Sequence, residues 1–224
     1  MTRLGRDFFA RPVLEVAPDL LGCVLVRAEV RVRITETEAY AGELDPASRV
    51  LRRRTAHNDP VHGEAGLAFV YFTYGHHWML CLGTDGPGVP NVVLVRAGEV
   101  VGGEPVVRGR RGEHPHRDLA RGPGRLTRAL GIEGGHSGLD VCRPAVAPPA
   151  DLHVSAAPTP RGPVAVGPRV GVRGPGGDGA AYPWRFWLEG EPTVSPYRAA
   201  AARQRDARPS VGTRGQPGGP AARG

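Results

Sequence analysis

Two carboxylates and a phenol close a strand-like run of the sequence that begins at Val30. With the two-residue period of a β-strand, Glu36, Glu38 and Tyr40 fall on the same face as Val30 and Ile34. Because that face begins apolar, the pattern predicts that both carboxylates point into the protein, where an unpaired charge is costly. A carboxylate in such a place either forms an ion pair with an arginine or acts as an acid or base in catalysis. The pattern leaves both interpretations open.

The composition is that of a folded, basic protein of one domain or at most two. Of its 224 residues 40% are hydrophobic, enough for a core, while 33 glycines and 23 prolines predict many loops. The formal net charge is +7, and every basic side chain other than histidine is an arginine. This charge favours a polyanionic partner such as nucleic acid.

Neither a metal ion nor another cofactor is predicted. The cysteines, Cys23, Cys81 and Cys142, lie far apart without a zinc-binding spacing, and no two histidines stand four residues apart. Sparse cysteines in odd number favour reduced thiols in the cytoplasm. No apolar run approaches the length that crosses a membrane, so we expect a cytoplasmic protein without membrane contact.

Apolar periodicity and turn residues predict strands, short helices and long loops. The predicted elements are a helical segment (7–22), strands (23–27, 30–40, 90–97, 164–173 and 182–190), a hairpin (67–82) that turns at Tyr74 and Gly75, and a helix (122–132). Two long loops are expected, over 41–66 and 102–121. Residues 1–196 are expected to form one domain, and residues 197–224, rich in Ala, Arg, Gly and Pro, a disordered tail.

Seven segments together resemble one protein family. They are residues 36–40, 45–48, 70–75, 94–97, 122–132, 169–172 and 183–186. In order and spacing they resemble the 3-methyladenine DNA glycosylases of the alkyladenine type, and the likeness extends from about Asp7 to about Ser195. The resemblance implies an α+β single domain with a curved, mainly antiparallel sheet, surrounding short helices and a protruding β-hairpin.

The resemblance also implies a reaction. Enzymes of this family flip alkylated or deaminated purines out of duplex DNA and hydrolyse the N-glycosidic bond (EC 3.2.2.-), which starts base excision repair. It implies that Glu38 is the general base that activates water and that Arg96 holds that water or supports Glu38. It implies that Tyr40 and Tyr71 sandwich the flipped base and that Tyr74 fills the gap left in the duplex.

Three positions differ from the family pattern. Arg49 stands where the family has a pocket histidine, Cys81 where it has an asparagine, and His57 where it has an arginine. Because a thiol is a poorer hydrogen-bonding group than an amide, Cys81 is expected to relax the exclusion of guanine. Arg49 is expected to stack on a neutral purine and to repel a cationic one. Both residues are therefore predicted to shape the base pocket.

The predicted partner is double-stranded DNA that contains damaged purines, bound by a monomer that associates with the nucleoid. The arginines expected to contact DNA are Arg52, Arg53 and Arg54 in the first long loop and Arg125 near the start of the later helix. Glycosylases that also cut the strand use an amine, from a lysine or an N-terminal proline, to form a Schiff base. This sequence has no lysine and starts with Met1, which favours a monofunctional hydrolase.

Two other functions fit the sequence less well. One is a lesion-binding relative with weakened catalysis, which the departures at Arg49, His57 and Cys81 suggest and which Glu38 argues against. The other is a carbohydrate hydrolase in which Glu36 and Glu38 form the acid/base pair. That mechanism needs carboxylates on either side of the bond, whereas residues two apart on a strand lie side by side.

Overall fold

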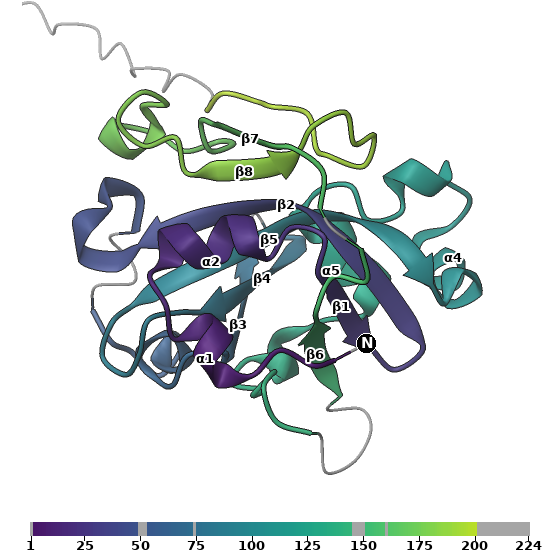
Figure 1. Ribbon diagram of the computed structural model, residues 1–224, viewed down its shortest axis with the longest axis horizontal. Helices are drawn as coiled ribbons and strands as arrows, with labels where there is room; N and C mark the ends of the chain where they lie inside the picture. The colour runs from purple at the N-terminus through teal and green to yellow at the C-terminus, as the bar shows by residue number, and fades with distance from the viewer. Residues whose placement is uncertain (1, 49–52, 74, 145–150, 160, 201–224) are drawn as a thin grey trace, which may run out of the picture.

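The computed structural model describes residues 2–48, 53–73, 75–144, 151–159 and 161–200 (Figure 1). Three of the predicted site residues, Arg49, Arg52 and Tyr74, lie outside the described residues, and so do positions 201–224 of the predicted tail. The roles assigned to them from the sequence therefore stay predictions.

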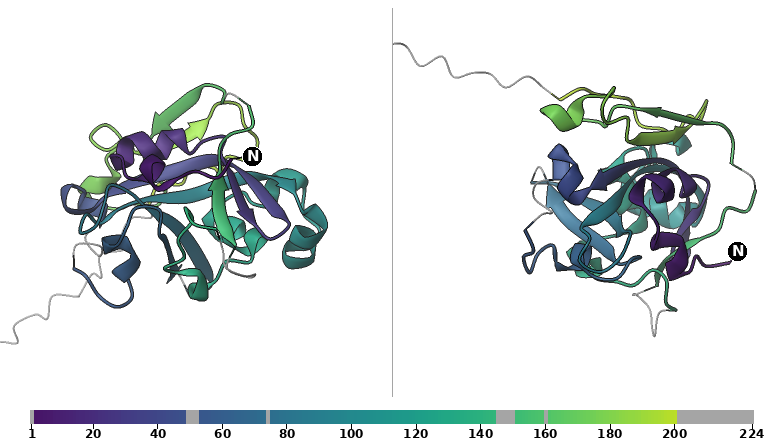
Figure 2. Two further views of the ribbon diagram at one scale, coloured as in Figure 1. Left: turned by 60° about the horizontal axis from the view of Figure 1, so that its bottom comes forward. Right: turned by 60° about the vertical axis from the view of Figure 1, so that its left-hand side comes forward.

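The strands form one sheet, and all of their pairings are antiparallel. They are β1 (Val24–Arg27), β2 (Val30–Ala41), β3 (Ala68–Thr73), β4 (His77–Gly83), β5 (Asn91–Gly102), β6 (Leu152–Ser155), β7 (Val164–Gly167) and β8 (Arg185–Leu188). Along the main path the order is β3-β4-β5-β2-β1-β6, and β8 pairs with β2 and carries β7 on its other side. The sheet curls rather than lying flat (Figure 2). This curled antiparallel sheet with a few short helices confirms the predicted α+β single domain.

Short helices surround the sheet. They are the α-helices α1 (Arg6–Phe9), α2 (Val13–Asp19), α4 (Glu104–Arg111) and α5 (Pro123–Leu130), and the 3₁₀ turns η1 (Gly42–Leu44), η2 (Pro46–Ser48), η3 (Asp59–His62), η4 (His116–Asp118), η5 (Gly134–His136) and η6 (Pro175–Gly177). Buried apolar side chains of α2 and α5 join those of most strands in the main core. A smaller second core forms from β3, β4 and β5, and the rings of Tyr40 and Tyr71 pack against it.

The register between β2 and β5 shifts twice in the middle of the sheet. The pairing skips Thr35 on β2 and Arg96 on β5, so each strand carries one extra residue there. An extra residue of this kind is a β-bulge, which bends the strand and re-aims the side chains around it. Bulges are common next to active sites for that reason.

The bulge changes which face of β2 points into the main core. Ile34 before it and Ala39 after it both belong to the main core, although unbroken alternation would put them on opposite faces. Glu36 and Glu38 alternate with Ala39 and therefore point to the opposite side of the sheet from the main core. The single continuous face predicted over residues 30–40 is wrong, but the prediction that both carboxylates are buried is correct.

Prolines explain two of the predicted elements that the structure shortens. The helical segment predicted over 7–22 is two helices, because Pro12 disfavours helical backbone at the residue before it and starts α2 anew. The strand predicted over 164–173 ends at Gly167, because Pro168 has no N–H to donate to the sheet. Residues 169–172, expected as a strand, form a loop instead.

Two elements were not predicted at all. The second predicted loop, residues 102–121, contains α4, whose start is marked by Gly103 in the left-handed conformation (φ 71°) followed by Pro105 in the first turn. The arginines of this helix leave too few apolar residues for a helical period to be recognised in the sequence. The four-residue strand β6 pairs only with β1 among the described strands, and its pattern is too short to distinguish from a loop. By contrast, the helix predicted over 122–132 is present as α5, with Gly131 left-handed (φ 67°) at its end.

The close approach of β2 and β5 next to the bulge requires glycine at position 98. A Cβ atom there would lie 2.4 Å from Cγ1 of Val32 and 2.5 Å from the carbonyl oxygen of Arg33. We therefore expect Gly98→Ala to lower the free energy of unfolding by about 1–3 kcal/mol, measured by urea denaturation. Gly109→Ala is the control, because Gly109 lies in α4 with no atom within 4 Å of an added Cβ. Equal stability of the two variants would contradict the packing argument.

Candidate active site

Glu36 is an ion-paired, structural carboxylate. Its Oε1 lies 2.8 Å from Nε of Arg96 and 2.8 Å from Nε of Arg185, and it accepts the hydroxyl of Ser195 at 2.9 Å. Its Oε2 accepts the backbone N–H of Ser195 at 2.8 Å. Burial by itself would favour the protonated acid, but the two guanidinium groups and the Ser195 hydrogen bonds outweigh it and lower the pKa of Glu36. The ion-pair interpretation therefore holds for this residue.

Glu38 is as buried as Glu36 but has fewer ion-pair partners. Its Oε1 accepts the backbone N–H of Val170 at 2.7 Å, and its Oε2 accepts the hydroxyl of Tyr40 at 2.8 Å. The one cation within ion-pair distance among the described residues is Arg96, whose Nη1 lies 3.2 Å from Oε2. Glu38 thus shares one arginine with Glu36 and has no second one of its own.

Arg96 is the cation between the two carboxylates. Burial alone would lower the pKa of Arg96, but the nearby Glu38 and Glu36 raise it, so the guanidinium keeps its charge. Arg96 is also the bulge residue of β5. Because Val93 and Val95 point into the main core, the alternation of the strand places Arg96 on the opposite face, where the carboxylates lie.

Tyr40 is held between Glu38 and a second buried ion pair. The guanidinium of Arg169 lies 4.6 Å from the centre of the Tyr40 ring and forms hydrogen bonds of 2.5 and 2.8 Å with the two oxygens of Asp45. Burial and the negative charge of Glu38 raise the pKa of Tyr40. The phenol therefore keeps its proton and donates a hydrogen bond to Glu38.

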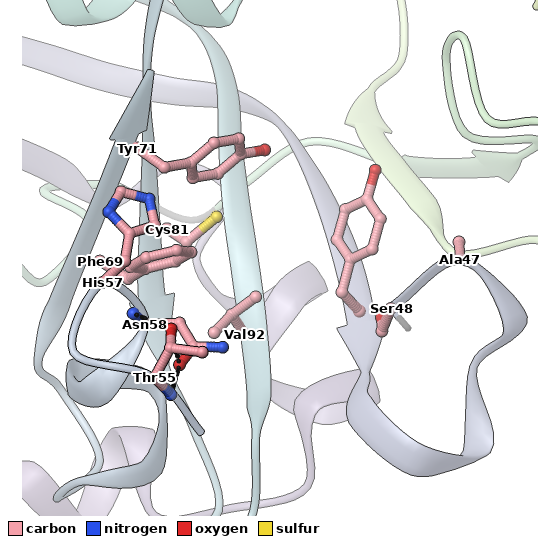
Figure 3. A pocket seen from close by; sticks show the side chains of 10 residues that line it. Ala47, Ser48, Thr55, His57, Asn58, Phe69, Tyr71, Cys81 and Val92 are labelled. Atoms are coloured by element: carbon pink, nitrogen blue, oxygen red, sulfur yellow. Dashed lines mark hydrogen bonds between the residues drawn. The ribbon is translucent and has the colours of Figure 1, made fainter. Parts of the chain in front are cut away.

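An aromatic cavity of about 240 Å³ opens beside Tyr40. Its walls come from β2, β3, β4, β5 and the first long loop: Tyr40, Ala47, Ser48, Thr55, His57, Asn58, Phe69, Tyr71, Cys81 and Val92. The rings of Phe69 and Tyr71 are stacked with centres 5.2 Å apart. Figure 3 shows Tyr71, Phe69 and Cys81 on one wall and Ala47 and Ser48 across from them.

Three of the four residues predicted for the base pocket line the aromatic cavity. They are Tyr40, Tyr71 and Cys81. The sequence interpretation missed Phe69, which follows the alternation of the hairpin strand two residues before Tyr71 and could have been found from it. Burial raises the pKa of the Cys81 thiol, and the charge of Glu38 adds to this, so Cys81 is a neutral thiol in the wall.

A wider outer cavity of about 810 Å³ meets the aromatic cavity at Tyr40 and Tyr71. Arg96 and Val170, which both contact Glu38, line it as well. A flat group held by Tyr40 and Tyr71 would therefore lie next to Arg96 and Val170, the two partners of Glu38 that line the outer cavity.

The predicted DNA-contacting arginines that the structure describes are exposed. Arg53 and Arg54 lie in the first long loop, where Nε of Arg54 forms an ion pair of 2.6 Å with Asp59. Arg125 lies in the first turn of α5, with Nη1 at 3.6 Å from Asp118. Within the described part of the chain no three His, Cys, Asp or Glu side chains gather as a metal site, and no helix there is long and apolar enough to cross a membrane.

A buried carboxylate beside an aromatic cavity suits a hydrolase of N-glycosidic bonds, because aromatic faces can hold a flat base and a carboxylate can activate water. Residues 7–192 match the model of the methylpurine-DNA glycosylase (MPG) family. The chain belongs to the methylpurine-DNA glycosylase family. It is a DNA glycosylase that acts in the repair of alkylated bases, and DNA is its substrate.

Several curated relatives cover nearly the whole chain. A protein of Streptomyces avermitilis is 46% identical over 209 residues, which is 91% of this chain and 96% of the relative. One from Leifsonia xyli subsp. xyli is 46% identical over 87% of this chain and 92% of the relative. One from Methanocella arvoryzae is 42% identical over 87% of this chain and 96% of the relative. Each is named "Putative 3-methyladenine DNA glycosylase".

The ion pairs of Glu36 predict a pH-dependent contribution to stability. Glu36→Gln removes the charge that Arg96 and Arg185 share, so we expect the free energy of unfolding at pH 7 to fall by about 3–5 kcal/mol. Because folding lowers the pKa of Glu36 below its ordinary value of 4.5, the stabilisation is complete above that pH and is lost as the pH falls through the folded-state pKa. Urea denaturation of both proteins at several pH values should show the difference shrinking below pH 4.5.

The control is Glu99→Gln, because Glu99 pairs with Arg33 in a half-exposed place and should cost at most about 1 kcal/mol. A difference between wild type and Glu36→Gln that stays constant down to the acid unfolding of the protein would contradict the ion-pair assignment.

Proposed function

We propose that this enzyme takes an alkylated or deaminated purine nucleotide out of duplex DNA and hydrolyses its N-glycosidic bond with Glu38 as the base. The observation that carries the proposal is the position of Glu38. It is fully buried, and its partners Tyr40, Arg96 and Val170 line the cavities that meet at the two tyrosines.

Glu38 suits the role of general base better than Glu36. Taking a proton would cost Glu36 its pairing with Arg96 and Arg185, whereas Glu38 has one arginine, Arg96, within ion-pair distance among the described residues. Water next to Glu38 loses a proton to the carboxylate as its oxygen bonds to the sugar carbon, and the electrons of the broken bond leave with the base. The negative charge of Glu38 also stabilises the positive charge that develops on the sugar.

The aromatic cavity suits a purine. Tyr40 and Tyr71 offer two ring faces for stacking, and a stacked base gains about 1–3 kcal/mol per aromatic contact. The neutral Cys81 thiol is a small, weak hydrogen-bonding group in the wall, so it supports a pocket that admits more than one purine. Tyr74 is proposed to fill the gap in the duplex, and Arg53 and Arg125 to contact phosphates.

The sequence and the site favour a monofunctional hydrolase. The sequence has no lysine, so no lysine amine is available for a Schiff base with the sugar. Water activated by Glu38 then remains the nucleophile. We further infer that the enzyme acts as a monomer on the DNA of the cytoplasm.

The geometry also weighs against the two other functions. In a carbohydrate hydrolase Glu36 would have to exchange protons, but its oxygens are held by Arg96, Arg185 and Ser195. A relative with weakened catalysis would have no reason to keep Glu38 in this hydrogen-bonded arrangement, which costs the energy of burying a carboxylate.

Replacing the base tests the mechanism directly. Glu38→Gln keeps the shape of the side chain but not its basicity, so base release in single turnovers should fall about 100- to 10,000-fold. Lesion binding, measured by fluorescence anisotropy, should stay within a few-fold of wild type. The assay uses duplexes with hypoxanthine, ethenoadenine or 3-methyladenine followed by alkali cleavage. Glu99→Gln should release base at the wild-type rate, and wild-type release by Glu38→Gln on every lesion would overturn the proposed mechanism.

The hydrogen bond from Tyr40 to Glu38 predicts a second role for this tyrosine. Tyr40→Phe keeps the ring for stacking but removes a donor to a charged group, worth about 1.5–3 kcal/mol, so base release should slow about 10- to 100-fold. The measurement is single-turnover base release from the hypoxanthine duplex.

The control for Tyr40→Phe is Tyr182→Phe, since Tyr182 lines neither the aromatic nor the outer cavity. It should leave the rate of base release unchanged. A Tyr40→Phe enzyme that releases base at the wild-type rate would show that the phenol contributes only its ring.

A further inference from the structure

A basic cleft of about 840 Å³ lies between the β3–β4 hairpin, α4 and α5. Its cationic and titratable lining consists of Arg27, His76, His77, Arg110, Arg111, Arg125, Arg128, Glu133 and His136. Five arginines against one glutamate make it strongly positive. Neither the aromatic cavity nor the outer cavity shares a residue with it.

Most of these arginines have no carboxylate partner among the described residues. Arg27, Arg110, Arg111 and Arg128 form none of the ion pairs found there, and Arg125 reaches Asp118 only at 3.6 Å. The cleft therefore carries several positive charges that are in no ion pair within the described part of the chain.

Backbone carbonyls fix these side chains in place. Arg27 donates to the carbonyl of Leu130 at 2.9 Å and Arg110 to that of Ala129 at 2.8 Å, both at the C-terminal end of α5. Arg128 donates to the carbonyl of Arg110 at 2.9 Å. A guanidinium has five N–H donors, so each arginine keeps donors for an anion after these bonds.

The arginines also repel one another. Burial lowers the pKa of Arg27 and the neighbouring Arg110 lowers it further. Burial likewise lowers the pKa of Arg111, and Arg125 and Arg128 add to the effect. Because like charges are held together at a cost, a bound anion would relieve a repulsion that already exists in the free protein.

The cleft lies on the opposite face of the hairpin from the aromatic cavity. Tyr71 points toward the aromatic cavity, whereas Phe72 and Trp78 pack together on the other face with ring centres 4.8 Å apart. Trp78 lines the cleft, and so do His76 and His77 next to the hairpin turn. The hairpin thus separates the aromatic cavity from the basic cleft.

We propose that the basic cleft binds the sugar–phosphate backbone of the same DNA duplex, on the far side of the hairpin from the extracted nucleotide. The proposal rests on the proposed function, in which the hairpin tip enters the duplex. The cations come from β1, α4 and α5, and the volume exceeds that of a single phosphate, which fits several consecutive phosphates of one strand. Duplex contacts on both faces of the hairpin would hold the DNA against it while the base is out.

Salt dependence tests this interaction. The double variant Arg110→Gln/Arg128→Gln should reduce the slope of log affinity against log salt by about 0.9 for each phosphate that the cleft no longer neutralises, or about 1–2 in total. The measurement is fluorescence anisotropy with undamaged duplex at several salt concentrations. Arg110→Lys/Arg128→Lys keeps the charge and should restore most of the wild-type slope, and a thermal melt confirms that each variant is folded.

The matched control is Arg11→Gln/Arg161→Gln, which removes the same charge next to Asp19 at α2, away from the hairpin. Its slope should equal that of wild type. A wild-type slope for folded Arg110→Gln/Arg128→Gln would overturn the proposal, and so would an equal reduction in both double variants. Binding of inorganic phosphate to the cleft without a change in the DNA slope would identify a small-anion site and also overturn it.

The result is separable from the proposed function. Base release by the wild type reports on Glu38 and the aromatic cavity, whereas the salt slope on undamaged DNA requires no chemistry. Absent base release with a reduced slope in the cleft variant would reject the proposed mechanism and support the cleft. Normal base release with an unchanged slope would do the reverse.

Discussion

The site depends on one arginine between two buried carboxylates. Arg96 lies 2.8 Å from Glu36 and 3.2 Å from Glu38, and both carboxylates are buried. Without this cation two negative charges would lie two residues apart in a low-dielectric surrounding, where at least one would take up a proton. The bulge in β2 makes the arrangement possible, because it turns Glu36 and Glu38 away from the main core to the face on which Arg96 lies. The β-bulge and the ion pairs therefore occur at the same point of the sheet.

The same cluster ties the C-terminal part of the domain to β2. Glu36 binds Arg185 and Ser195, which are 149 and 159 residues away in sequence. Glu38 accepts a hydrogen bond from the N–H of Val170. Arg169, which is paired with Asp45, lies over the ring of Tyr40. A carboxylate and a stacking ring fixed in this way need little rearrangement when substrate arrives, which is the benefit of preorganised polar groups in catalysis. The stability of the fold and the geometry of the site rest on the same interactions.

The hairpin of β3 and β4 separates the aromatic cavity from the basic cleft. One face supplies Phe69 and Tyr71 to the aromatic cavity, and the other packs Trp78 beside the basic cleft. In the proposed function, alternation along two paired strands serves two kinds of recognition, stacking on one side and charge on the other. Both faces belong to a single two-stranded hairpin.

The sequence by itself determined the chemistry and the local elements. The alternation around Glu38 and Tyr40, the hairpin and the helix α5 between Pro123 and Gly131 depend on short-range patterns, so they could be predicted. Only the tertiary structure decided which glutamate is structural, because Arg185 and Ser195 are distant in sequence and reach Glu36 but not Glu38. It also decided the direction of both carboxylates, since the register with β5 creates the bulge that redirects them. Partners in space, and not the residues next to them in the chain, distinguish the two carboxylates.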